Sequence, residues 1–477
     1  MLKRSKSLQT TAVTAEAKST FERSSDMKFV TTRVAIAASA LFLAAGLVDN
    51  AVAAASSIYL AQSAAGSGDG SSCANARAAS SFNSASNWGT GATQIGAGTT
   101  VHLCGTVTTS LTFQGSGTST AGVTLDGTGA TYAGAISTGA NLSWWRIQNV
   151  TWASTSTFTG VPITVLGGSN GVITGNRADN VQGGQALFIG QYNGAAMASN
   201  IDVSNNYFRT TNADMGNTQH DLIDTEGSTN VTIEGNYLEM RAGGAGDQAH
   251  DDIIQTWQKG GTNAGPPSNW TIRYNMIVMN SAATNDRSWM MLENLTGTVN
   301  IYSNVLVGLS GADSANGIAT DSDGSGVVLN IFNNTIVAKG TASNNVMNLN
   351  APGAVNVRNN IVDTVAQEAL VGNMAVTRDH NLWVGSNVPN CGSTELCQVN
   401  PQFTDYTNNN FMPAANSPIL ASGVNLGTTY GKAIAVNATW PNPALVDRPT
   451  TGNWALGAYA TTATAVVLPA PTSLRVN

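Results

Sequence analysis

The sequence predicts an all-β chain whose short strands stack as a parallel solenoid. One motif recurs along the chain: a β-branched residue, a polar residue, an aliphatic residue, two polar residues, an asparagine and two apolar residues, as in "NVTIEGNYL" and "NIDVSNNYF". The composition agrees, because Gly numbers 50, only 10% of residues are charged, and the helix formers Lys and Glu are scarce. Each unit is too short to bury an apolar face alone, so successive units must stack.

The asparagine of each motif gives the spacing of the units. The copies are anchored at Asn176, Asn206, Asn236, Asn275, Asn304, Asn334 and Asn360. The separations are 30, 30, 39, 29, 30 and 26 residues, and a weaker copy places Asn149 another 27 residues upstream. One coil of a parallel β-solenoid takes roughly 20–30 residues. We expect these asparagines to lie in turns near the left-handed region and to form an amide ladder inside the coil.

The repeat resembles that of the right-handed parallel β-helix proteins of the pectin-lyase-like superfamily, from about Ile58 to Tyr459. The segment "NPQFTDYTNNNFMPAANSPILASGVN" is similar to the closing segment of secreted β-helix proteins that act on polysaccharides. The resemblance implies a single right-handed parallel β-helix domain over residues 54–460, in the style of polysaccharide lyases and polygalacturonases, and a linker or tail over 461–477. It leaves the reaction open, since the superfamily includes lyases, hydrolases, epimerases and non-catalytic adhesins.

The first 53 residues are predicted to be an N-terminal extension and a signal peptide. A basic stretch precedes the apolar run at 34–48, and small residues near Ala53 suit cleavage. The run is too short for a comfortable membrane span. The true start is either Met1 or Met27. We expect a secreted protein, extracellular or periplasmic.

The four cysteines form two pairs at the two ends of the mature chain. In an oxidising compartment we expect the disulfides Cys73–Cys104 and Cys391–Cys397, out of three possible connectivities. The alternative is a metal site, although the spacing does not suit zinc.

The charge balance argues against one class of partner. Residues 1–53 carry seven Lys or Arg and four Asp or Glu, so 14 basic and 24 acidic residues remain after cleavage, a net charge of −10. Nucleic acids need a basic surface, so we expect no nucleic-acid partner. A polyanionic substrate would need a local basic group or a bridging metal ion. We expect a monomer that does not associate with membranes.

A functional groove must lie on outward side chains of neighbouring strands. The segment "QHDLIDTEG" (219–227) aligns with "HDDIIQTWQ" (250–258), which places Asp224 over Gln255, 31 residues apart. The extra residues of the 39-residue step then fall after Trp257. The alignment predicts that Gln191, Asp224, Gln255 and Glu293 stack as a column, with Asp321 nearby.

The candidate site residues gather around these two strands. The candidate catalytic residues are His220, Asp221, His250, Asp251, Asp252, Lys259 and Arg287. The candidate substrate-binding residues are Asp224, Gln255, Trp257, Glu293, Arg241 and Trp289. Carboxylates and amides can bind sugar hydroxyls, and an aromatic ring can form a platform for a sugar face. The same residue types also serve in turns, so it is their concentration on neighbouring strands that favours a groove over a polar turn.

Two family comparisons suggest a reaction. The Asp-bearing strands resemble those of β-helix polygalacturonases, which would assign Asp221, Asp251 and Asp252 as acid and base of an inverting hydrolysis. The sequence departs from that family, because it has no Gly-His-Gly segment on the next unit and no Arg-x-Lys strand beyond it.

The second resemblance is to β-helix lyases for uronate polysaccharides. Such a lyase neutralises the uronate carboxylate, often with calcium, and uses a base for the proton at C5. Asp224, Asp252 and Glu293 would hold calcium, and Lys259, His250 or Arg287 would act as base. We favour this polysaccharide lyase hypothesis over a hydrolase or epimerase, and over a third, non-catalytic glycan-binding or adhesin-like β-helix.

Overall fold

The computed structural model describes most of the chain after residue 52. The described ranges are 53–153, 160–181, 185–191, 196–210, 221–241, 251–258, 265–280, 287–309, 316–321, 326–340, 345–350, 353–365 and 367–460. All of them belong to one compact unit, Ala51–Asn477. The expected signal peptide and tail, and the candidates His220, His250 and Lys259, lie outside these ranges and stay predictions.

The described strands form three long parallel sheets. Sheet 1 runs, in spatial order, through β2 (Arg77–Ala78), β1 (Ser57–Ala61), β3 (Thr100–Cys104), β6 (Val123–Asp126), β9 (Ser143–Gln148), β11 (Ser169–Thr174), β14 (Ala198–Ser204), β17 (Ser228–Glu234), β20 (Thr271–Arg273), β23 (Thr298–Tyr302), β26 (Val327–Phe332), β29 (Gly353–Arg358) and β32 (Ala375–Asp379). Sheet 2 runs through β12 (Arg177–Val181), β15 (Tyr207–Thr210), β18 (Tyr237–Met240), β21 (Met276–Met279), β24 (Val305–Gly308), β27 (Thr335–Ala338), β30 (Ile361–Thr364), β33 (Leu382–Val384) and β34 (Leu396–Cys397). Sheet 3 runs through β5 (Leu111–Thr112), β8 (Ile136–Ala140), β10 (Ile163–Leu166), β13 (Leu187–Gly190), β16 (Ile223–Glu226), β19 (Asp251–Trp257), β22 (Arg287–Leu292), β25 (Asn316–Thr320), β28 (Met347–Leu349) and β31 (Val371–Gly372).

Shorter elements complete the described part. Small sheets are formed by β4 (Thr106–Val107) with β7 (Thr131–Tyr132), β35 (Phe403–Asp405) with β36 (Asn410–Pro413), and β37 (Lys432–Ala435) with β38 (Leu445–Asp447) and β39 (Tyr459–Ala460). The described helices are all 3₁₀ helices: η1 (Cys73–Asn75), η2 (Ala79–Asn83), η3 (Ala85–Asn87) and η4 (Thr428–Tyr430). No helix in the described ranges is long and apolar enough to cross a membrane.

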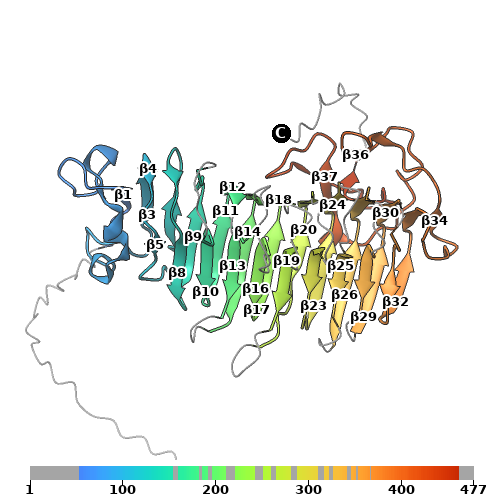
Figure 1. The fold of residues 1–477 in the computed structure, drawn as a ribbon, viewed down its shortest axis with the longest axis horizontal. Helices are drawn as coiled ribbons and strands as arrows, with labels where there is room; N and C mark the ends of the chain where they lie inside the picture. Colours follow the sequence, from blue (N-terminus) through green and yellow to red (C-terminus); the bar gives the residue numbers. More distant parts are fainter. Residues whose placement is uncertain are drawn as a thin grey trace, which may run out of the picture. The chain divides into compact units, whose positions relative to one another are not determined.

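From β11 to β31, each coil contributes one strand to each sheet (Figure 1). From β11 to β33 the chain visits sheet 1, sheet 2 and sheet 3 in turn, and each strand pairs in parallel with the strand three places later, as β14 does with β17. Crossovers between parallel strands of one sheet are right-handed because of the strand twist. The right-handed parallel β-helix predicted from the repeat is therefore confirmed.

An amide ladder runs along the corner between sheets 1 and 2. The Oδ1 of Asn206, for example, accepts hydrogen bonds from both the backbone N–H and the side-chain Nδ2 of Asn176, one coil earlier. The Nδ2 of Asn206 also donates to the carbonyl of Ile173, so the buried amide is fully paired. The same pattern continues through all seven predicted asparagines and ends at Asn381. Their predicted structural role is confirmed.

The turn geometry differs from expectation in one detail. The left-handed residue is the one before the ladder asparagine, as at Asn205 (φ 58°) and Tyr274 (φ 58°). Asn149 occupies this left-handed position (φ 55°), and its neighbour Val150 takes the ladder place, donating its backbone N–H to Asn176. The ladder therefore begins at Asn176, because the weaker copy has its asparagine one residue early.

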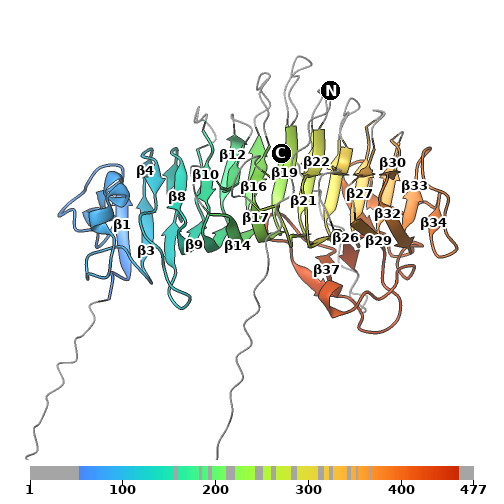
Figure 2. The ribbon, with the colours of Figure 1, turned by 90° about the horizontal axis from the view of Figure 1, so that it is seen from below.

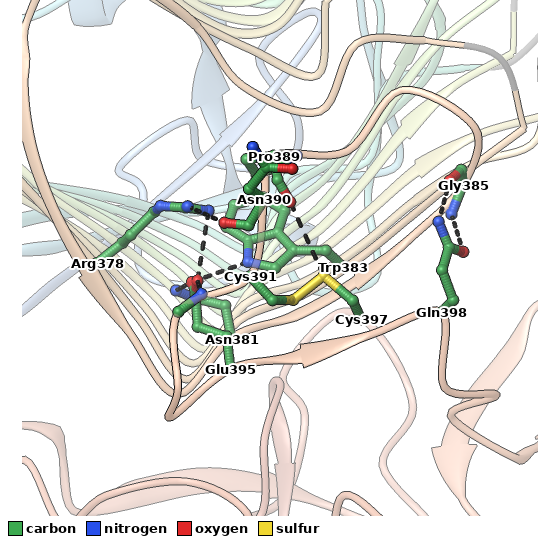
Figure 3. The surroundings of a disulfide bond; sticks show 11 residues. Arg378, Asn381, Trp383, Gly385, Pro389, Asn390, Cys391, Glu395, Cys397 and Gln398 are labelled. Carbon is green, nitrogen blue, oxygen red and sulfur yellow. Dashed lines mark hydrogen bonds and ion pairs between the residues drawn. A yellow bond between two sulfur atoms is a disulfide. The ribbon is translucent and has the colours of Figure 1, made fainter.

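The ladder ends on a carboxylate. Asn381 donates from Nδ2 to Oε1 of Glu395 at 3.1 Å, and the indole of Trp383 donates to the same oxygen at 2.8 Å (Figure 3). The other oxygen of Glu395 accepts the backbone N–H of Gly392 and lies 3.4 Å from Arg378. Glu395 lies in the loop closed by the disulfide Cys391–Cys397, one of two disulfides predicted from the sequence. The other, Cys73–Cys104, is also formed.

The C-terminal segment covers part of the outer surface of the coil. Val305 and Val307 of β24 belong to a second apolar core that includes Phe411, Ile434 and Tyr459. Figure 2 shows β37, a strand of the C-terminal segment, beside the coil. The ring of Tyr430 packs edge to face on Tyr302 and Phe332 at the adjoining corner. No described residue of sheet 3 belongs to this second core, so the outward positions of sheet 3 lie outside it.

Candidate functional site

The strand register on sheet 3 confirms the central alignment made from the sequence. In β16 and β19, Ile223 pairs with Ile254, Asp224 with Gln255, and Thr225 with Thr256. Ile223 and Ile254 point into the core, so Asp224 and Gln255 lie on the outward side of neighbouring strands. The added residues of the longer coil fall after Trp257, as predicted.

The predicted column is wrong at its two ends. Gln255 pairs with Met291 of β22, not with Glu293. Glu293 lies two residues further along, where its backbone N–H bonds to Thr256 and its neighbour Asn294 bonds to Asp321. In the sequence "MML", either Met291 alone or both Met290 and Leu292 could face the core. In the structure Met290 and Leu292 face inward.

At the other end, Asp224 pairs with Phe188 of β13. Gln191 was predicted to share the column but follows the end of β13, three residues beyond Phe188. The outward column therefore runs Phe188, Asp224, Gln255, Met291, with Trp257, Glu293 and Asp321 beside it in the next outward positions.

Asp224 is an acid of this face whose pKa is raised. Its Oδ2 accepts a hydrogen bond from Nε2 of Gln185, and its Oδ1 accepts one from Nε1 of Trp257, both at 3.0 Å. Burial is the largest influence and raises the pKa of Asp224 to about 6, although both hydrogen bonds lower it. A carboxyl with this pKa exchanges its proton near neutral pH, which suits proton transfer or proton sharing.

Gln185 was missed by the sequence analysis. It lies two residues before β13, and the backbone N–H of Ala186 donates to the carbonyl of Leu222, which places Gln185 beside Asp221 in the register. Extending the alignment by one residue upstream would have put Gln185, Asp221 and Asp252 in one column. The signal was present, but glutamine there is as common in a plain turn.

Asp221 and Asp252 lie below the surface. Oδ1 of Asp221 accepts the backbone N–H of Asp252 at 3.0 Å, and Oδ1 of Asp252 accepts the backbone N–H of Ser288 at 2.6 Å. Both side chains are buried, with Asp252 fully so. The two carboxylates thus link successive coils at the start of the sheet 3 strands, in the manner of the asparagines at the other corner.

The remaining candidate residues do not lie together at one site. Asp251 and Arg287 begin β19 and β22 and pair in register, but their side chains lie outside the described part. Arg241 lies beyond sheet 2, where its Nε donates to buried Glu239 at 2.8 Å. Trp289 was predicted to bind substrate but is buried, with its Nε1 donating to the carbonyl of Val307. Leu222, Ile253 and Trp289 occupy equivalent places in successive coils, and all three are buried. Strict alternation of inward and outward residues did not predict this.

The predicted calcium ligands do not converge. Asp224 lies on the outward column, Asp252 is buried beneath Ser288, and Glu293 stands beside Trp257. No group of three His, Cys, Asp or Glu residues in the described ranges could hold a metal ion. We therefore derive no step through calcium from these three residues.

Comparisons with known proteins concern the fold. No family model and no curated protein matches the chain. Similar solved structures include the pectate lyase Pel9A (13% identity over 85% of this chain and 96% of that chain, TM-score 0.44). Others are a PL6 family polysaccharide lyase from Pseudopedobacter saltans (12%, 67% and 90%, TM-score 0.43) and a mannuronic acid specific polysaccharide family 6 lyase from human gut microbiota (11%, 63% and 78%, TM-score 0.23).

Proposed function

We propose that the chain is a secreted carbohydrate-active protein, a polysaccharide lyase that cleaves a uronate-containing glycan by β-elimination on the outward face of sheet 3. The observation that carries the proposal is the Asp224 carboxyl, which is bound by Gln185 and Trp257 and has its pKa raised to about 6. The two disulfides support export to an oxidising compartment.

Asp224 supplies what a β-elimination on a uronate needs first. The C5 proton becomes acidic only when the negative charge of the neighbouring carboxylate is neutralised or hydrogen-bonded. A bound uronate brings a second negative charge to Asp224 and raises its pKa further, so the two carboxyl groups can share one proton. Asp224 then acts as a neutral acid that donates a hydrogen bond, a role that burial can give to a carboxyl group.

A neighbouring aromatic side chain suits an extended glycan. Trp257 is partly exposed while its Nε1 donates to Asp224, whereas Gln255, beside Asp224, is buried. An indole presents a wide apolar surface to a sugar ring. The base that takes the C5 proton stays a prediction: Lys259, His250 or Arg287.

An inverting hydrolase that uses Asp221, Asp251 and Asp252 is less well supported. Asp221 and Asp252 are buried and accept backbone N–H bonds, whereas an acid and a base for hydrolysis must both reach the glycosidic bond. A binding-only function is the remaining alternative, and the experiment below distinguishes it.

The test is a polysaccharide panel with the purified secreted chain. Uronate polymers and neutral polymers are incubated in parallel, and ultraviolet absorbance follows the C4–C5 double bond that β-elimination creates. We expect the absorbance to rise with a uronate polymer and stay flat with neutral polymers. New reducing ends without absorbance would indicate hydrolysis, and binding with neither signal would indicate a non-catalytic glycan-binding protein.

A further inference from the structure

A second site lies on sheet 2, away from Asp224. A cleft of about 410 Å³ opens between β30 and β33 and the segment 398–406 that follows β34. This volume lies within the range of roughly 300–1,000 Å³ that small-molecule sites occupy. Its lining combines one carboxylate, Asp363, with two aromatic rings, Phe403 and Tyr406, and with the amides of Asn400 and Gln402.

Asp363 supplies the carboxylate of the cleft lining. It points outward from β30 between Val337 and Val384, its two partners in the register. No residue in the described ranges donates a hydrogen bond to it, and its burial raises its pKa to about 6. Asp363 is only partly buried and lines the cleft, so its carboxyl group can accept hydrogen bonds from a molecule bound there.

Contacts of Lys339 fix the aromatic side of the cleft. Nζ of Lys339 donates to Oδ1 of Asn409 at 2.6 Å and to the carbonyl of Tyr406, and it lies 4.5 Å from the centre of the Tyr406 ring. The rings of Phe403 and Tyr406 are nearly parallel, with 15° between their planes. Tyr406 is nevertheless 37% exposed, so its position is fixed while part of its ring remains available.

The amide side of the cleft is also ordered. Gln398 exchanges two hydrogen bonds with the backbone of Gly385 (Figure 3). Oδ1 of Asn400 accepts the backbone N–H of Gln402 at 2.7 Å. Asn400 and Gln402 are exposed, and within the described ranges neither the Nδ2 group of Asn400 nor the side chain of Gln402 makes a hydrogen bond, so both can donate to a ligand.

We propose that this cleft binds a neutral sugar unit, with Asp363 accepting hydrogen bonds from its hydroxyls and Tyr406 packing against its apolar ring face. A neutral ligand fits best, because Asp363 repels a uronate and Lys339 repels an ammonium group. The site is independent of the proposed lyase reaction, since it lies on a different sheet and shares no residue with the Asp224 column.

The test measures affinity by calorimetry, using neutral gluco-, galacto- and manno-oligosaccharides with glucuronate as the acidic probe. Asp363→Ala and Tyr406→Ala should each weaken binding of the neutral ligand at least about tenfold, through loss of a charge-assisted acceptor and of the platform. Tyr406→Phe keeps the ring and should bind more tightly than Tyr406→Ala, which attributes the loss to the ring and not to the hydroxyl. Binding should strengthen as the pH rises through about 6, because the ionised carboxylate is the better acceptor.

The melting temperatures of the variants distinguish the loss of a ligand contact from the loss of the fold. Tyr406→Ala should fold, because it removes only a partly exposed ring. The proposal is overturned if no neutral oligosaccharide binds the unmodified protein, if glucuronate binds equally well, or if both alanine variants bind as before. Asp224→Ala should leave this affinity unchanged, so failure of the lyase proposal and failure of this one give different results.

Discussion

The indole of Trp257 donates a hydrogen bond to the carboxylate of Asp224, from one coil to the coil before it, with 3.0 Å between Nε1 and Oδ1. Asp224 is thereby held between Trp257 and Gln185, side chains from three successive coils. A carboxyl group held on both oxygens keeps a fixed direction toward a substrate on the outward face. The first three predictions follow from this arrangement.

Asp224→Ala should lower lyase turnover by about 100-fold, since it removes the group that neutralises the uronate carboxylate. Asp224→Asn should retain more activity, with a loss of only about tenfold, because its amide still donates a hydrogen bond. Initial rates of absorbance increase on a uronate polymer measure both. Equal losses in the two variants would contradict a role as hydrogen-bond donor.

Turnover should fall as the pH rises above the pKa of Asp224, which is about 6 in the free protein. Trp257→Phe removes a donor that lowers this pKa, so the descending limb of the pH–rate profile should move upward by up to about one pH unit. Trp440→Phe is the control, because that indole donates to the distant carbonyl of Tyr274. A limb that stays in place in Trp257→Phe would exclude Asp224 as its source.

The stability of the fold should depend on Asp224 in a defined direction. Its folded-state pKa of about 6 lies above the ordinary 3.8, so stabilisation is present below 3.8 and is lost as the pH rises through about 6. The Asp224→Asn variant does not ionise at this position. Its free energy of unfolding should therefore rise relative to that of the unmodified protein over that interval, by at most about 3 kcal/mol. Denaturant unfolding at both ends of the interval measures the difference, and a constant difference would refute it.

Asp252→Ala should destabilise the fold by about 1–3 kcal/mol, because the backbone N–H of Ser288 loses its buried acceptor. Asp252→Asn keeps an acceptor oxygen and should remain closer to the unmodified protein in both melting temperature and turnover. A variant Asp252→Asn that folds normally but has no turnover would instead restore Asp252 as a catalytic residue.

Asn275→Ala should destabilise the fold by about 2–4 kcal/mol. It removes the acceptor of Asn236 and the donor to the carbonyl of Ile233, all of them buried. Asn437→Ala, at an exposed asparagine, is the matched control and should change the free energy of unfolding by less than about 0.5 kcal/mol. Similar effects of the two substitutions would show that the amide ladder contributes little.

The sequence was sufficient for the features that repeat. The spacing of the asparagines predicted the coil, and the similarity of two segments predicted that Asp224 faces Gln255. The phase of Glu293 was not predictable, because four consecutive apolar residues, Trp289 to Leu292, leave the alternation ambiguous. The buried role of Asp252 was not predictable either, since a carboxylate that binds a backbone amide and one that binds substrate have the same sequence signature.

The cleft around Asp363 had no sequence signal. Asp363 lies in a regular coil, while Phe403 and Tyr406 lie in the closing segment about 40 residues later. They meet only because that segment folds back over sheet 2, a path that no periodicity encodes. Asp363 stands out only after folding, as a carboxyl group that lines a cleft together with two aromatic rings.

Glu395 has a consequence for the size of the molecule. A stack of equivalent coils has no inherent length, and its open end is a template on which another chain could polymerise. A carboxylate accepts hydrogen bonds but cannot pass one onward, so the directional series of amides stops at Glu395. One acidic residue in a seven-residue disulfide loop thus helps to set where the coil terminates.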